Sequence, residues 1–192
     1  MTHAPAWDLS IFRLVNGRWT CAVMDVIAPA FQPSWVAIAP AVLLAAWIWR
    51  RGGADGRRAV IAALLAVALA DLLAAQIVKP WVERLRPSIA LEDVRLLVGK
   101  KSGFGFPSNH AANLAAAATA VALLARRFAW PIAALALFVG YTRVYVGVHY
   151  PLDVIGGYCV GVVAGTVAVL ATQKFGPTPR QDARGKPLGT IT

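Results

Sequence analysis

Three clusters of charged and polar residues stand out in a strongly apolar chain: Lys79 with Arg86-Pro87, Pro107-Ser108-Asn109-His110, and Arg143 with His149 and Asp153. Lys79, Arg86 and Arg143 supply three fixed cations, and the planar fork of arginine matches two phosphate oxygens at once. A charge inside or at the end of an apolar segment is by default a functional residue, because burying it in a membrane is unfavourable. The spacing therefore predicts a site for an anion such as phosphate.

Two of the three histidines in the chain belong to these clusters. Pro151 suits the first position of a helix, so Asp153 falls in the first helical turn, close behind His149. Asp153 can then accept a hydrogen bond from one imidazole nitrogen and direct the other towards phosphorus, as in the triads of nucleophilic enzymes. In that arrangement His110 protonates the leaving oxygen. The two histidines therefore indicate phosphoryl transfer.

Ser108 precedes a predicted helix, where serine is a favourable N-terminal cap. The unpaired backbone N–H groups around Ser108 and Asn109 then point towards the loop side, and such a helix terminus can receive a phosphate. Plain helix capping is the alternative role for Ser108. The sequence alone leaves both roles open.

Other interpretations of these residues also stay open at this point. A mutual salt bridge between Arg143 and Asp153 is the simplest alternative. The remaining loop cations are expected to be solvated or to touch lipid headgroups; they are Arg84, Arg95, Lys100 and Lys101. A zinc site needs further ligands beside two histidines and one aspartate, and the nearby cations disfavour it. No metal is therefore expected.

Composition places the chain in a membrane. Its 192 residues are 58% hydrophobic with mean hydropathy +0.61, whereas a soluble domain is about 45–50% apolar. The net charge of +10 comes from residues that lie between apolar runs, which is typical of membrane-protein loops and not of nucleic-acid-binding proteins. We therefore expect one membrane-embedded domain over residues 1–192, with the lipid bilayer and no nucleic acid as partner.

Five apolar segments are long enough, or nearly so, to cross a bilayer, for which a helix needs about 20 residues. They run over residues 31–49, 59–78, 111–125, 128–148 and 152–172. The third is short, so its helix is expected to begin before residue 111. A further segment from Trp19 is interrupted by Asp25, Pro29 and Pro33. The sequence thus predicts an all-α integral membrane protein with about five transmembrane helices, or six if the Trp19 segment also crosses.

The termini and one long loop complete this layout. Residues 1–30 form an interfacial N-terminal segment, in which Asp8, Arg13 and Asn16 lie opposite the apolar face of a helix. Residues 173–192 are rich in proline and glycine and are expected to form a flexible cytoplasmic tail. The connection 79–110 is unusually long, and long loops in compact proteins are usually functional. We therefore expect it to be an active-site loop.

The charges of the loops predict the orientation. Two short connections on one side are filled by Arg50, Arg51, Arg57, Arg58, Arg126 and Arg127. The positive-inside rule assigns this side to the cytoplasm. We expect a multi-pass protein of the bacterial cytoplasmic (inner) membrane whose active site faces the periplasm or the cell exterior. The loop 79–110 is also basic, against the rule, and its predicted function explains the exception.

In order and spacing, the three clusters resemble the signature of the type 2 phosphatidic acid phosphatase superfamily: K-x6-R-P, then P-S-G-H, then S-R-x5-H-x3-D. The matching residues run from Lys79 to Asp153. Asn109 stands where the family has glycine, and Thr142 stands where it has serine. Both replacements are small and polar, and neither removes a reacting group. The multi-span layout extends the resemblance over most of the chain.

The resemblance implies a lipid phosphatase that needs neither metal nor cofactor. His149 attacks phosphorus to form a phosphohistidine, Asp153 orients it, and His110 protonates the leaving group before water releases phosphate. The phosphate oxygens are held by Lys79, Arg86, Arg143 and the backbone at Ser108 and Asn109. Because His149 must be neutral while His110 is protonated, a bell-shaped pH profile is expected.

The resemblance favours undecaprenyl diphosphate as substrate, because small members of the superfamily are similar to bacterial undecaprenyl diphosphatases. Phosphatidylglycerophosphate, phosphatidate and lipid A phosphates are the alternatives. A haloperoxidase is disfavoured because those enzymes are soluble. A lipid or anion transporter is the non-enzymatic alternative, since the intramembrane Arg143 and Asp71 also suit a charged pathway.

Two further features concern support and packing. Asp71 lies within an apolar span and is expected to anchor Lys79 or another buried donor. Gly157, Gly161 and Gly165 have the spacing typical of close helix packing, either within the chain or between two copies. The oligomeric state therefore stays open.

Overall fold

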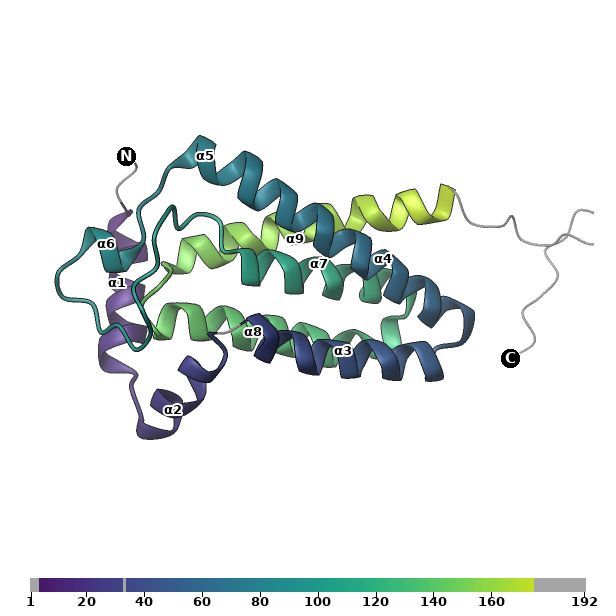
Figure 1. Cartoon of the computed structure of the whole chain (residues 1–192), viewed down its shortest axis with the longest axis horizontal. Helices are drawn as coiled ribbons and strands as arrows, with labels where there is room; N and C mark the ends of the chain where they lie inside the picture. The colour runs from purple at the N-terminus through teal and green to yellow at the C-terminus, as the bar shows by residue number, and fades with distance from the viewer. Residues whose placement is uncertain (1–3, 33, 175–192) are drawn as a thin grey trace, which may run out of the picture.

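The computed structural model describes residues 4–32 and 34–174, which form helices and loops and, in this part of the chain, no β-strand. The long helices run side by side along the molecule (Figure 1): α3 (Ser34–Arg51), α4 (Gly53–Leu72), α7 (Asn109–Leu124), α8 (Ala129–Tyr145) and α9 (Pro151–Lys174). Short helices gather at one end: α1 (Ala6–Arg13), α2 (Ala22–Ala30), α5 (Lys79–Val82) and α6 (Pro87–Ala90). We call this the capped end. The all-α prediction is confirmed.

Each of the five predicted apolar segments forms a helix. Helix α7 begins at Asn109, ahead of residue 111 as expected. Within the described residues, three helical segments are long and apolar enough to cross a membrane: Gly53–Val82, Arg126–Tyr145 and Pro151–Gln173. Helix α2, at nine residues, is much shorter than the roughly 20 residues that a crossing needs. The chain is a multi-pass membrane protein, and the number of crossings stays a prediction.

Small residues hold the centre of the bundle together. A buried cluster of alanines joins α4, α7 and α9: Ala62, Ala66, Ala70, Ala74, Ala112, Ala116, Ala120, Ala164 and Ala168. A Cβ at Gly161 would lie 2.4 Å from the carbonyl oxygen of Ala112, and one at Gly157 would lie 2.6 Å from that of Ser108. The glycine row of α9 therefore packs on α7, which confirms that it serves packing within the chain.

The N-terminal segment differs from the prediction in which face it buries. Asp8 and Asn16 were expected opposite the apolar face, yet both are buried, while Trp7 and Ile11 are exposed. The Asn16 amide group donates to the carbonyls of Arg95 and Tyr145, and its oxygen accepts from the Arg95 N–H. A buried polar group is tolerated when it is hydrogen-bonded. Helix α1 and the turn η1 (Leu14–Arg18) therefore dock onto the protein through a mixed face, on which Phe12 and Val15 are buried beside Asp8 and Asn16.

The long loop covers the same end. Its residues Val94, Leu96, Leu97 and Val98 pack against the cluster that contains Phe12 and Val144. The loop cations split into two groups: Lys100 and Lys101 are exposed as expected, whereas Arg84 is 3% exposed and Arg95 pairs with Asp25. The expectation of a solvated Arg84 is wrong, because two buried carboxylates stabilise its charge. The predicted tail 173–192 lies outside the described residues from 175 onward.

Candidate active site

The capped end brings the three sequence clusters together. Helix α4 continues through the π-helical turn η2 (Leu73–Val78) into α5, which places Lys79 at the end of a 30-residue apolar segment. Glu83 ends α5 with a left-handed backbone (φ 50°, ψ 33°), and the chain then runs extended to Arg86. Within the loop, the Gly105 N–H donates to the carbonyl oxygen of Arg84 (2.7 Å). The Ser108 N–H donates to the carbonyl oxygen of Asp153 (2.9 Å), which holds the first turns of α7 and α9 beside each other.

His149 lies in the connection between α8 and α9 and is 4% exposed. Its Nδ1 faces Asp153 Oδ2 at 3.4 Å, and its Nε2 lies 3.1 Å from Arg86 Nη1. A guanidinium group only donates hydrogen bonds, so Nε2 must be the acceptor and Nδ1 must carry the ring proton. Asp153 Oδ2 also accepts from the Tyr150 N–H at 2.9 Å. This is the tautomer that a nucleophile needs, with the free electron pair on Nε2.

Burial lowers the pKa of His149 to about 4, and the hydrogen bond that its Nδ1–H donates to Asp153 partly opposes that shift. The ring is therefore neutral at ordinary pH. Burial, assisted by the charge of Arg143, also lowers the pKa of His110 to about 4. His110 is thus neutral in the free protein. A negative charge within about 4–6 Å favours the protonated ring, so a bound phosphate raises the pKa of His110.

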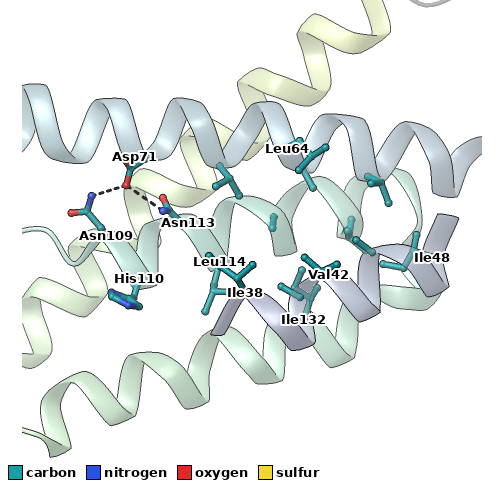
Figure 2. Close-up of a pocket in the computed structure, with 17 residues that line it drawn as sticks. Ile38, Val42, Ile48, Leu64, Asp71, Asn109, His110, Asn113, Leu114 and Ile132 are labelled. Carbon is teal, nitrogen blue, oxygen red and sulfur yellow. Dashed lines mark hydrogen bonds between the residues drawn. The ribbon is translucent and has the colours of Figure 1, made fainter. Parts of the chain in front are cut away.

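His110 is in the first turn of α7, with its Nε2 atom buried and without a hydrogen-bond partner among the described residues. Figure 2 shows its ring turned away from Asp71, on the other side of the helix from Asn109 and Asn113. An unpaired buried nitrogen is unfavourable unless a ligand completes it. The position suits transfer of a proton to or from a bound group.

The three predicted phosphate cations, Lys79, Arg86 and Arg143, all lie at this end. Lys79 donates to the carbonyl oxygen of Pro107, and Arg86 donates to that of Val148 at 3.1 Å. Arg143 is 1% exposed and donates to Gln32 Oε1 at 2.8 Å and Thr142 Oγ1 at 3.0 Å. Within residues 4–32 and 34–174, none of the three forms an ion pair with a carboxylate.

The alternative of an Arg143–Asp153 salt bridge is therefore wrong. Asp153 Oδ1 instead accepts from Arg84 Nη1 at 2.7 Å. In the described part of the chain, Arg143 is left with the neutral partners Gln32 and Thr142. A buried cation without a counter-charge is strongly unfavourable, so its environment favours binding of an anion.

Ser108 differs from its predicted capping role. Its side chain forms no capping hydrogen bond, and its Oγ is buried without a described partner. Its N–H already donates to the backbone carbonyl oxygen of Asp153. The hydroxyl, and not the backbone N–H, is the group that Ser108 can offer to a ligand. The backbone N–H is not available because the carbonyl oxygen of Asp153 in α9 already accepts from it.

Asn109 turns its side chain away from the cations. Its amide group donates to Asp71 Oδ1 at 2.8 Å, and Asn113 donates to the same oxygen at 3.2 Å (Figure 2). Asp71 was expected to anchor Lys79 or another donor. It accepts hydrogen bonds from the two amides of α7 and forms none with Lys79 among the described residues. The side chain that replaces the family glycine therefore points towards α4 and leaves the Asn109 N–H open.

Two residues of this site were missed from the sequence. Arg84 joins Asp153 to Asp8, which reaches the site from α1. The sequence could have indicated Arg84, because it lies two positions before Arg86 and alternate residues of an extended segment point to the same side. Asp8 carried no such signal. Its contact with Arg84 spans 76 positions in the chain.

A cavity of about 500 Å³ begins at His110 and runs between α3, α4, α7 and α8. Its polar end holds Asp71, Asn109 and Asn113, and the rest is lined by aliphatic side chains as far as Ile48 (Figure 2). The described residues contain no cluster of three or more His, Cys, Asp or Glu that could hold a metal ion. Of the predicted catalytic residues, His110 is the one that lines this apolar cavity.

A helical membrane bundle with paired histidines among unpaired cations defines a class of membrane phosphatase. Residues 59–177 match the PAP2 superfamily, and the chain belongs to this family. It is 30% identical over 159 residues to undecaprenyl-diphosphatase BcrC of Bacillus subtilis (strain 168), covering 82% of this chain and 80% of that protein. The family and its phosphatase relatives identify this protein as a lipid phosphatase.

Other relatives have different names. A lipid A 4'-phosphatase of Porphyromonas gingivalis is 29% identical over 160 residues, which cover 80% of this chain and 61% of that protein. The crystal structure of Aquifex aeolicus LpxE superimposes with a TM-score of 0.69 and 28% identity, covering 86% of this chain and 96% of that one. The similarity confirms the predicted family and fold and leaves the particular lipid undetermined.

Proposed function

We propose that the protein hydrolyses a phosphate monoester or diphosphate on a membrane lipid without a metal ion, through a phosphohistidine on His149. The observation that carries this proposal is the set of cations Lys79, Arg86 and Arg143, which lack carboxylate partners in the described chain, together with a neutral histidine whose Nε2 lies 3.1 Å from Arg86. Such a site is complementary to an anion that reacts with a nucleophile.

In the first step, His149 Nε2 attacks phosphorus and the bond to the leaving oxygen breaks. His110 donates its proton to that oxygen, and Asp153 stabilises the imidazole as its Nδ1–H becomes more acidic. In the second step, His110 accepts a proton from water, the water oxygen attacks phosphorus, and the N–P bond breaks. Phosphate leaves, and both histidines return to their starting protonation states.

Charge on the phosphate oxygens spreads as the leaving group departs, and fixed donors stabilise it most in a site that excludes water. Arg86 and Arg143 are anchored by Val148 and Thr142, so their donors are already oriented. The Ser108 hydroxyl and the Asn109 N–H add neutral donors. Side chains of the protein thereby stabilise the charge on the phosphate oxygens, as metal ions do in many other phosphoryl-transfer enzymes.

The cavity supports a lipid substrate. It meets His110 at its polar end and is otherwise lined by aliphatic residues such as Ile38, Val42 and Leu64, which suits a hydrocarbon chain that stays within the bilayer. Undecaprenyl diphosphate is the substrate we favour, on the match to the Bacillus subtilis relative. Lipid A phosphate is second, on the match to the Porphyromonas gingivalis relative. The phosphatase identity displaces the transporter alternative.

The location of the site belongs to the same proposal. The short connections with Arg50, Arg51 and Arg127 lie at the opposite end of the bundle from the capped end. Placing that end in the cytoplasm directs the active site to the periplasm or exterior of an inner-membrane protein. Residues 1–192 then form one membrane-embedded domain.

The test is phosphate release by the purified protein in detergent with EDTA. The substrates are undecaprenyl diphosphate, lipid A, phosphatidylglycerophosphate and phosphatidate, and His149→Ala is the control. We expect activity that resists EDTA and is lost in the variant, with undecaprenyl diphosphate turned over fastest. Activity that persists in His149→Ala contradicts the nucleophile, and activity abolished by EDTA contradicts metal independence.

A further inference from the structure

Arg84 lies at the centre of a buried charge network behind the histidine. Its guanidinium donates through Nη1 to Asp153 Oδ1 (2.7 Å) and through Nη2 to Asp8 Oδ2, and it stacks 4.5 Å from the centre of the Tyr150 ring. The exposed fractions are 3% for Arg84 and 0% for both aspartates. Charges are almost never this deeply buried unless they are paired.

Every oxygen of Asp8 and Asp153 has a partner in this network. Asp153 Oδ2 faces His149 Nδ1 and accepts from Tyr150 N–H, which leaves Oδ1 for Arg84. Asp8 Oδ1 accepts from the Leu152 N–H at 2.8 Å, in the first turn of the helix that carries Asp153. Helix α1 therefore holds both the arginine and the start of α9.

The net charge of the network also matters for His149. One arginine and two aspartates sum to −1, which equals the charge of Asp153 alone. Arg84 by itself would neutralise Asp153 and weaken its attraction for the proton on His149 Nδ1. Asp8 offsets that effect, so Asp153 is held in place while its charge is preserved.

We propose that Arg84 and Asp8 form a neutral pair that positions Asp153 against His149, which makes helix α1 part of the active site. This inference rests on the proposed function, because the pair acts through the phosphohistidine step. Both are positioning residues, since the hydrogen bonds of their side chains go to each other, to Asp153 and to the Leu152 N–H. Their substitution should lower kcat and leave KM for the lipid nearly unchanged.

Three variants separate charge balance from packing. Arg84→Met leaves two buried carboxylates with a sum of −2, Asp8→Asn leaves a sum of 0, and the double variant restores −1. We expect kcat to fall about 10- to 100-fold in each single variant, as when the group behind a reacting ligand is removed. The double variant should be several-fold more active than Arg84→Met. Loss of packing alone predicts a double variant that is no better than either single one.

The experiment measures kcat and KM for each purified variant with EDTA present, alongside Arg13→Met and His149→Ala. Arg13 is the matched control, because it lies on α1 in an exposed ion pair with Asp93 (3.1 Å), and its loss should change kcat less than about twofold. Thermal unfolding and gel filtration check the fold. If Arg84→Met does not fold, Asp8→Asn, which keeps the arginine and the side-chain shape, decides the matter.

The inference is overturned if the folded single variants keep wild-type kcat, if KM rises as much as kcat falls, or if the double variant shows no recovery over Arg84→Met. If one of these results occurs while His149→Ala is inactive, the positioning role has failed and the proposed function stands. Active His149→Ala overturns the proposed function, and the positioning role with it.

Discussion

Two sets of buried charges lie side by side at the capped end and differ in how they are compensated. Arg84 has two carboxylate partners, Asp8 and Asp153. Arg143, equally buried, bonds to the neutral Gln32 and Thr142 and to no carboxylate among the described residues. The paired set is complete within the protein and can fix geometry. The unpaired set favours binding of an anion, which supports the proposed phosphate site.

The largest effect should follow loss of the nucleophile that both sets serve. His149→Ala removes the atom that bonds to phosphorus, and we expect kcat to fall by about 10⁴-fold or more, as for other removed nucleophiles. Cys159→Ala, at an exposed position, is the control that keeps activity. Turnover within about tenfold of wild type in His149→Ala would mean that both sets serve some other reaction.

Next in size is loss of an unpaired cation. Arg143→Met removes a donor from the transition state, and we expect kcat/KM to fall about 10²- to 10³-fold. Because the wild-type cation has no carboxylate partner, the folded variant should unfold at a temperature no lower than wild type. Thermal unfolding in detergent checks this second point. A large loss of stability would place Arg143 with the paired set.

The pH dependence tests the two histidines. His149 is neutral above its pKa of about 4 and loses its free electron pair below it, so activity should fall about tenfold per unit on the acid side. His110 is protonated only below its own pKa of about 4 in the free protein. Bound phosphate raises that pKa, so the alkaline limb of kcat should lie at higher pH than that of kcat/KM. Limbs at the same pH would contradict the role of His110.

A change in the bundle should affect stability more than chemistry. In Gly161→Ala the new Cβ would lie 2.4 Å from the Ala112 carbonyl oxygen and 2.7 Å from Ala115 Cβ. We expect a loss of about 1–3 kcal/mol in the free energy of unfolding. Gly17→Ala is the control, because nothing lies within 4 Å of its Cβ position. Equal stability of the two variants would show that α9 does not pack on α7 this closely.

The smallest effect should come from replacing Asn109 by the glycine that the family motif has at this position. The Asn109 side chain bonds to Asp71, so Asn109→Gly removes this bond and keeps the backbone N–H that we propose as a phosphate donor. We expect kcat/KM to change less than about threefold, within the range of a substitution away from the reacting groups. A change above about tenfold would mean that the amide side chain contacts the phosphate.

The motif residues could be placed from the sequence because their spacing ties them to helix ends. Pro151 starts α9 and brings Asp153 behind His149, as the spacing predicts. The Asp153 network could not be placed, because Arg84 bonds to Asp153 across 69 positions and to Asp8 across 76, which leaves no local pattern. The burial of Asp8 and Asn16 could not be predicted either, because amphipathicity alone does not show which surroundings a polar face meets.

The most direct measurement is to trap the phosphoenzyme. The protein, with EDTA present, is mixed with labelled lipid diphosphate, quenched in alkali within one turnover, and digested to locate the label. The account predicts about one acid-labile, alkali-stable phosphoryl group per site, bound to His149, which chases to phosphate when unlabelled substrate and time are allowed. Rapid turnover without label on His149 would contradict it.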